Sequence, residues 1–163
     1  MYKRQEPFFA GEYAFDPRKA DHVRRGGDIS LVCAGNMLAH ALDAWNILKA
    51  QGRAVDLYSV CALSDLGEDS LVEMARHGRL VSVEDHNART GLGALLQSRF
   101  NDLGLACRVR KLGVTCYASS GPAKELYRLL GLDPAAIARA VDEEITRRSV
   151  VGGRGWPQSS EVF

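Results

Sequence analysis

The sequence lacks several features that would point directly to a common function. It contains neither a G-x-G-x-x-G nor a G-x-x-x-x-G-K-[ST] pattern, so the two usual phosphate-binding loops are absent. Its four cysteines include no C-x-x-C pair, and none has a histidine at ligand spacing, which disfavours a zinc site. No apolar run approaches the ~18 residues of a membrane span. The net charge of +1 gives no electrostatic reason to expect nucleic acid or an anionic membrane as a partner.

The remaining composition is ordinary for one globular domain. The chain has 163 residues, of which 46% are hydrophobic and 25% are charged. Unpaired cysteines predict reduced thiols and a cytoplasmic location. We predict a linker, or the truncated end of a preceding domain, over residues 1–17, a single domain over 18–148, and a flexible tail over 149–163. Positions 8–15 of the first region crowd four aromatic residues into a polar stretch: Phe8, Phe9, Tyr13 and Phe15. Such residues are normally covered by another part of a protein.

Short apolar runs recur at about the spacing of a βα unit and predict the fold class. They indicate strands over 28–34, 54–60, 79–84 and 107–112, each followed by a helical pattern. The more polar stretch 19–24 predicts an edge strand. Ser64 or Asp65 is predicted to cap the short helix after the 54–60 strand. Together these elements predict an α/β domain with a mostly parallel sheet between helical layers.

The densest group of polar side chains lies at the end of the 79–84 strand. Glu84, Asp85 and His86 end that strand, and the carboxyl end of a central strand is where open parallel sheets meet ligands or partner domains. A carboxylate and an imidazole could act as general acid and base. However, adjacent residues of an extended segment point in opposite directions, so the three groups cannot converge on one substrate atom.

We therefore favour a strand-end cluster that caps the next helix and contacts a neighbouring domain. The candidates for an interdomain or dimer interface are Glu84, His86, Gly91 and Gly93. Asp85 is predicted to point the other way, toward the amides of a neighbouring turn. The other histidines show no partner pattern and are predicted to lie on the surface: His22, His40 and His77.

Gly91 and Gly93 leave a second interpretation open. Backbone N–H groups at a helix start can bind an anion, which would suit a stand-alone nucleotide- or anion-binding module. The simpler interpretation is that glycines at this position permit a tight turn and close packing of the helix on the strand.

Four segments, in order, resemble the C-terminal domain of the transketolase-like, thiamine-diphosphate-dependent enzymes. They are RKADHVRRGGDISLVCAG, AVDLYSVCALSD, VSVEDHNARTGLGALL and LGVTCYASSGPAKELYRLLGLDPAAI. The resemblance extends from about Phe9 to about Arg147. One departure is Ala62, which stands where the family usually has proline, with Ser64 or Asp65 in place of the family's aspartate.

The resemblance implies a three-layer α/β/α domain of five strands, the first of them antiparallel to the others. It also implies that the chain carries no catalytic, cofactor-binding or metal-binding residue. In the family, thiamine diphosphate and Mg²⁺ are held in other domains by a Gly-Asp-Gly motif and a distant Asn, and the order Gly26-Gly27-Asp28 does not match that motif. The cofactor-activating glutamate also belongs to another domain, so Glu84 is not given that role.

The implied activity is the transfer of two-carbon ketol units between sugar phosphates. The implied partners are the preceding pyrimidine- and diphosphate-binding domains, or a separate subunit that carries them, in a homodimer. The β-subunit of a 2-oxoacid dehydrogenase and deoxyxylulose-phosphate synthase share this domain, and both stay open as alternatives.

Overall fold

The computed structural model describes residues 13–117 and 120–147. Its strands are β1 (Asp21–Arg24), β2 (Ile29–Ala34), β3 (Val55–Val60), β4 (Arg79–Asn87) and β5 (Arg108–Val114). Its helices are α1 (Met37–Ala50), α2 (Glu68–Ala75), α3 (Leu92–Asp102), α4 (Ala123–Leu129) and α5 (Pro134–Thr146). Most of the predicted linker and all of the predicted tail lie outside the described residues.

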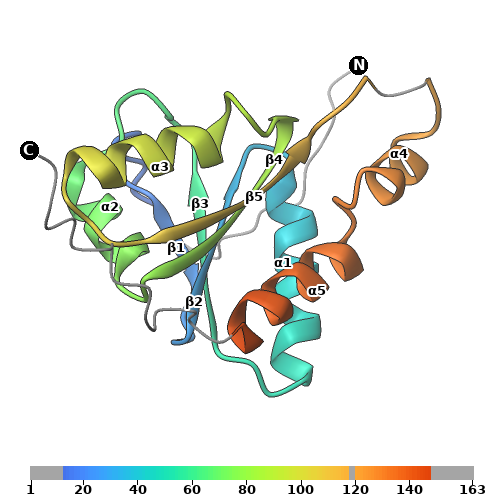
Figure 1. Cartoon of the computed structure of the whole chain (residues 1–163), viewed down its shortest axis with the longest axis horizontal. Coiled ribbons are helices and arrows are strands. Elements are labelled where there is room, and N and C mark those ends of the chain that lie inside the picture. Colours follow the sequence, from blue (N-terminus) through green and yellow to red (C-terminus); the bar gives the residue numbers. More distant parts are fainter. Residues whose placement is uncertain (1–12, 118–119, 148–163) are drawn as a thin grey trace, which may run out of the picture.

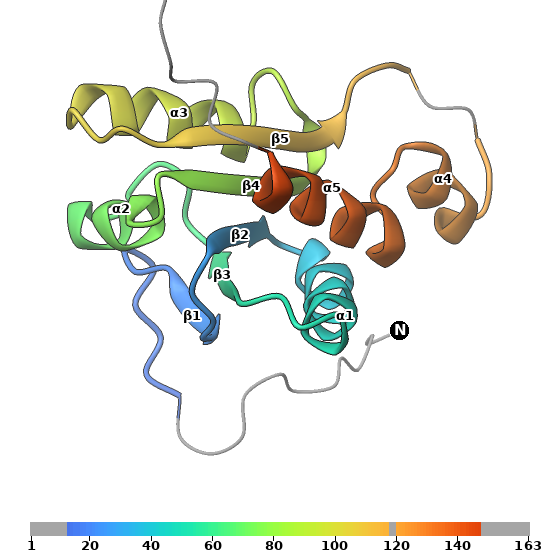
Figure 2. The same cartoon turned by 60° about the horizontal axis from the view of Figure 1, so that its bottom comes forward.

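The strands form one sheet between two helical layers. Their order is β1-β3-β2-β4-β5, with β1 antiparallel to β3 and the other neighbours parallel. Helices α1 and α5 cover one face, and α2 and α3 cover the other (Figures 1 and 2). The predicted three-layer α/β/α fold with an antiparallel first strand is confirmed.

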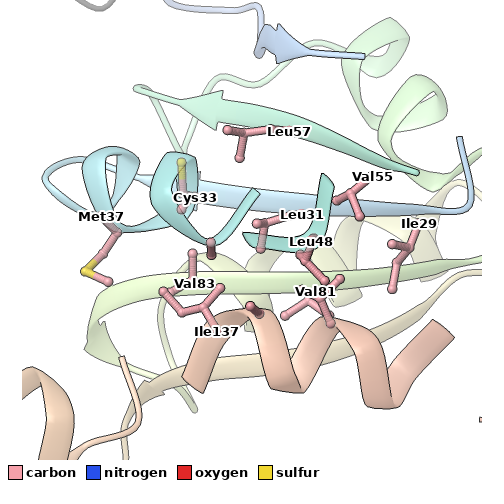
Figure 3. Close-up of a cluster of buried hydrophobic side chains, with 14 of the residues drawn as sticks. Ile29, Leu31, Cys33, Met37, Leu48, Val55, Leu57, Val81, Val83 and Ile137 are labelled. Carbon is pink, nitrogen blue, oxygen red and sulfur yellow. The ribbon is translucent and has the colours of Figure 1, made fainter. Parts of the chain in front are cut away.

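The alternation of side chains along the central strands divides the core into two parts. Ile29, Leu31 and Cys33 of β2 face the α1/α5 layer, where they meet residues such as Met37 and Ile137 (Figure 3). Burial raises the pKa of the Cys33 thiol to about 12. The α2/α3 face of the sheet is mixed, because its apolar residues are joined by four buried polar ones: Ser30, Asp56, Ser82 and Glu84. Among the described residues, the remaining buried polar side chain is that of Glu144 on α5, the helix layer of the opposite face.

Two predicted boundaries were wrong. Helix α2 begins at Glu68 after Gly67, and no side chain caps it, so neither Ser64 nor Asp65 does so. Strand β4 runs on to Asn87, because after a shift in register it pairs with β5 again through Val114. The Glu-Asp-His cluster is therefore part of a strand.

Strand β5 forms one edge of the sheet and carries three basic residues, Arg108, Arg110 and Lys111. Arg108 Nε lies 2.5 Å from Oε1 of Glu144 on α5, and Arg110 Nη2 lies 2.8 Å from Oε2 of Glu143. The edge strand is thus tied to the helix layer by ion pairs. None of the helices within the described ranges is long and apolar enough to cross a membrane.

Candidate functional site

Glu84 is turned into the protein and caps helix α3. Its side chain leaves β4 on the face that α3 covers, and the residue is only 3% exposed. The N–H of Leu92 donates to Oε2 at 2.6 Å, and the N–H of Gly93 donates to Oε1 at 3.1 Å. A carboxylate there satisfies two free N–H groups and complements the positive end of the helix dipole. The predicted helix cap exists, and Glu84 alone provides it.

The glycines of this loop are required by close approaches, that of the Glu84 carboxylate at Gly91 and those of Ser82 and Lys111 at Gly93. A Cβ atom on Gly91 would lie 1.6 Å from Oε2 of Glu84. A Cβ atom on Gly93 would lie 2.2 Å from Oγ of Ser82 and 2.5 Å from Cγ of Lys111. The simpler interpretation of the two glycines therefore holds, since the anion at this helix start is the chain's own carboxylate.

Asp85 and His86 lie on the surface at the carboxyl end of the sheet. Oδ2 of Asp85 accepts from the Tyr127 hydroxyl at 2.8 Å and from Nδ2 of Asn36 at 3.1 Å. The prediction that Asp85 faces the amides of a turn was wrong, because Glu84 occupies that place. The hydrogen bond to Asp85, aided by burial, raises the pKa of Tyr127. The His86 side chain makes no hydrogen bond or ion pair with the described residues.

The most heavily bonded carboxylate belongs to Asp56, near the start of β3 and thus at the opposite end of the parallel strands. It is fully buried. His77 Nε2 lies 2.6 Å from Oδ2, which Arg76 also contacts. His22 Nε2 lies 3.0 Å from Oδ1, which the N–H of Gly26 reaches at 2.8 Å. Burial alone would raise the pKa of Asp56, but the hydrogen bonds from these four partners, that from His77 first, hold it well below its usual range.

His22 links this cluster to α2 and to the core. Its Nδ1 lies 3.0 Å from Oε1 of Glu73, and its ring stacks on Tyr58 with 4.3 Å between centroids. The prediction that His22, His40 and His77 lie on the surface with no partner pattern was wrong, because each is half-buried and has a polar partner. His40 Nδ1, for example, lies 3.0 Å from the carbonyl oxygen of Leu132. One signal in the sequence was available, because a carboxylate inside an apolar strand needs partners.

The Asp56 cluster and its surroundings do not fit a thiamine diphosphate site. The Gly26–Asp28 segment packs against the start of β3, where a Cβ atom on Gly26 would lie 2.2 Å from the backbone nitrogen of Val55. The N–H of Asp28 is bonded to the carbonyl oxygen of Ala54. This backbone is packed against the sheet and presents no cradle for a diphosphate. Within residues 13–117 and 120–147, no group of three His, Cys, Asp or Glu side chains could hold a metal ion.

These observations define a class of domain. It is a three-layer α/β/α domain with the strand order 1-3-2-4-5, whose strand-end carboxylate serves the domain's own structure. The chain belongs to the family "Transketolase, C-terminal domain", whose model matches residues 18–137.

Individual relatives agree with this membership. A Methanocaldococcus jannaschii protein named as a transketolase C-terminal section is 27% identical over 148 residues, which are 90% of this chain and 45% of that protein. The 1-deoxy-D-xylulose-5-phosphate synthase of Heliobacterium modesticaldum is 28% identical over 77% of this chain and 20% of the enzyme.

A solved structure, described as a split-gene transketolase in an inactive β4 tetramer, superposes with a TM-score of 0.79. It is 27% identical, and the match covers 86% of this chain and 46% of that one. The chain therefore spans less than half the length of each of these relatives.

Proposed function

We propose that the chain is the C-terminal section of a thiamine-diphosphate-dependent, transketolase-type enzyme of the cytoplasm. The complete enzyme would transfer two-carbon ketol units between sugar phosphates. In this proposal residues 18–148 form the architectural domain, and residues 1–17 lead to the preceding pyrimidine-binding part. Homodimerisation would place two such sections in one molecule.

The observation that carries the proposal is that the Glu84 carboxylate binds backbone amides of its own domain. The carboxyl end of a central strand is where α/β proteins commonly place chemistry. Here the carboxylate at that end lies 2.6 Å and 3.1 Å from two backbone amides and caps a helix. The exposed groups at the same edge, Asp85 and His86, lie on a surface that a partner can reach. This supports a role in assembly with no residue in direct chemistry.

Two relatives support a partner on a separate chain. One is named as a C-terminal section, and the solved structure is described as a split-gene transketolase whose β4 tetramer is inactive. By analogy, this chain would need the preceding section for activity. The similarity to 1-deoxy-D-xylulose-5-phosphate synthase supports a second candidate of the same class. Activity assays with sugar phosphates, and with pyruvate plus glyceraldehyde phosphate, on the assembled enzyme would distinguish the two.

The chain alone is expected to bind no cofactor. Titration calorimetry with thiamine diphosphate and Mg²⁺ should give no binding heat, because the segment nearest in composition to a diphosphate motif, Gly26–Asp28, is packed against β3. The matched measurement uses the same chain mixed with the preceding section, where binding heat is expected. Micromolar affinity of the isolated chain would contradict the proposed division of roles.

The interface prediction stays a prediction and now centres on His86, since Glu84 and the two glycines face each other inside the chain. In the assembled enzyme, His86→Ala is expected to weaken assembly by ~1–3 kcal/mol, because it leaves a polar partner unsatisfied. Turnover per assembled dimer should change little. Sedimentation and steady-state kinetics on the same preparation measure the two effects.

Gln51→Ala is a suitable control, because Gln51 is exposed at the far end of α1. It should leave both assembly and turnover unchanged. If His86→Ala gave intact dimers whose turnover fell by ~100-fold, as losing a general acid or base does, the assembly role would be wrong.

A further inference from the structure

Helix α4 is unusual because none of its residues is buried. It has seven residues, and Leu129 on its outer side is 75% exposed, although the leucine pattern of this segment resembles that of a packed helix. Figure 2 shows α4 beyond the end of α5, past the end of the sheet toward which β5 points. A helix this short is not stable by itself in water. Its position must therefore depend on a small number of contacts.

Those contacts converge on Tyr127. Its hydroxyl donates to Oδ2 of Asp85 at 2.8 Å and accepts from Nδ2 of Asn36 at 3.0 Å. Nδ2 of Asn36 also lies 3.1 Å from Oδ2 of Asp85, so the three groups close a triangle. The ring of Tyr127 meets the His40 ring edge-on, with 4.7 Å between centroids. Beside it, Leu130 packs against the α1/α5 core.

A short glycine-containing segment joins α4 to the fixed body of the domain. Gly131, directly after the helix, has a φ of +68°, a conformation that residues with a side chain rarely adopt. The next residue, Leu132, is fully buried, and its N–H donates to the carbonyl oxygen of Tyr127 at 2.7 Å. The fixed body of the domain thus resumes immediately after this glycine, and the backbone bond from Leu132 to Tyr127 is a further contact that release of α4 has to break.

We propose that α4 is a latched element, held against the carboxyl end of the sheet by the triangle of Tyr127, Asp85 and Asn36. Release of the latch frees the Asp85 carboxylate from its two hydrogen-bond partners and uncovers the start of α1 while the sheet and α5 stay folded. The latch joins α4 to a surface that lies at the carboxyl ends of β2 and β4. Its opening is a local event, because the contacts that it breaks are few and lie at the surface.

Hydrogen–deuterium exchange on the chain tests the latch without any partner. Tyr127→Phe keeps the ring and removes only the hydroxyl. We expect exchange of the α4 amides, such as those of Leu126 and Leu130, to become about tenfold faster, as loss of a hydrogen bond to a charged group implies. Amides of α1, α5 and the sheet should exchange as in the wild type. Tyr117→Phe is the matched control, because Tyr117 is fully exposed.

A second variant distinguishes a latch from independent contacts. Asp85→Ala should speed α4 exchange as much as Tyr127→Phe does, and the double variant should be no faster than either single one, because each change opens the same triangle. Effects that multiply in the double variant would overturn the proposal. Unchanged α4 exchange in Tyr127→Phe, or faster exchange throughout the domain, would also overturn it. None of these outcomes bears on the proposed function, since no partner or cofactor takes part.

Discussion

Asp56→Asn is expected to lower the free energy of unfolding by about 3 kcal/mol, because a buried ion pair that loses one partner leaves the other charges uncompensated. The carboxylate is fully buried and accepts from groups on β1, on the β1–β2 turn and at the end of α2. Asparagine keeps the shape but brings an amide N–H₂ toward donors. Urea unfolding of the two proteins at pH 7 measures the difference. Asp65→Asn is the control, since Asp65 is exposed and makes no bond with the described residues.

The difference in unfolding free energy between wild type and Asp56→Asn is expected to depend on pH. The pKa of Asp56 is held well below its usual range in the folded protein, whereas in the unfolded chain it is about 3.9. The stabilisation is therefore complete above about pH 4 and is lost as the pH falls toward the lower, folded pKa. The stability difference between wild type and Asp56→Asn should narrow below about pH 4. A difference as large at pH 3 as at pH 7 would contradict this account.

The second large effect is expected at the cap of α3. Glu84→Ala should remove about 3 kcal/mol of stability, since it leaves two amides without an acceptor and opens a cavity. Gly91→Ala should remove about 2 kcal/mol or more, because its new Cβ would displace the carboxylate from the same place. Urea unfolding of both variants measures these differences.

The double variant is the decisive measurement. Without the Glu84 side chain, a Cβ at position 91 meets no carboxylate, so the second change should add little to the first. Gly27→Ala is the matched control, because its Cβ would meet only Cβ of Ala54 at 3.9 Å and should alter stability by no more than about 1 kcal/mol. Additive losses in the double variant would show that the two residues act separately.

Much of the fold could be predicted because it follows from local patterns. The apolar runs of β2, β3 and β4 are almost continuous, as strands covered on both faces require. The polar end of β4 and the two glycines after it, Gly91 and Gly93, also indicated the start of α3. Which of Glu84 and Asp85 caps α3 was not predictable in the same way. The alternation of side chains along a strand shows that the two residues face opposite sides of the sheet, but it does not show which side α3 covers.

The Asp56 cluster was missed for a different reason. The four partners of Asp56 come from positions 22, 26, 76 and 77, and Glu73 joins the cluster through His22. These positions belong to separate elements and lie 20 to 34 residues from Asp56 where they contact it. No spacing rule connects such residues before the strand order is known. Once β1 is placed beside β3, His22 is opposite Tyr58, and the cluster follows.

The basic edge strand has a consequence for how copies of this domain behave in a crowded solution. An unpaired edge can add the edge of another chain and so begin an aggregate. If two β5 strands met side by side, Arg108, Arg110 and Lys111 of each would approach the same residues of the other. Like charges so placed repel, most strongly at Lys111, since Glu144 and Glu143 partly compensate the charges of Arg108 and Arg110. The basic residues of β5 thus also discourage the sheet from growing beyond the molecule.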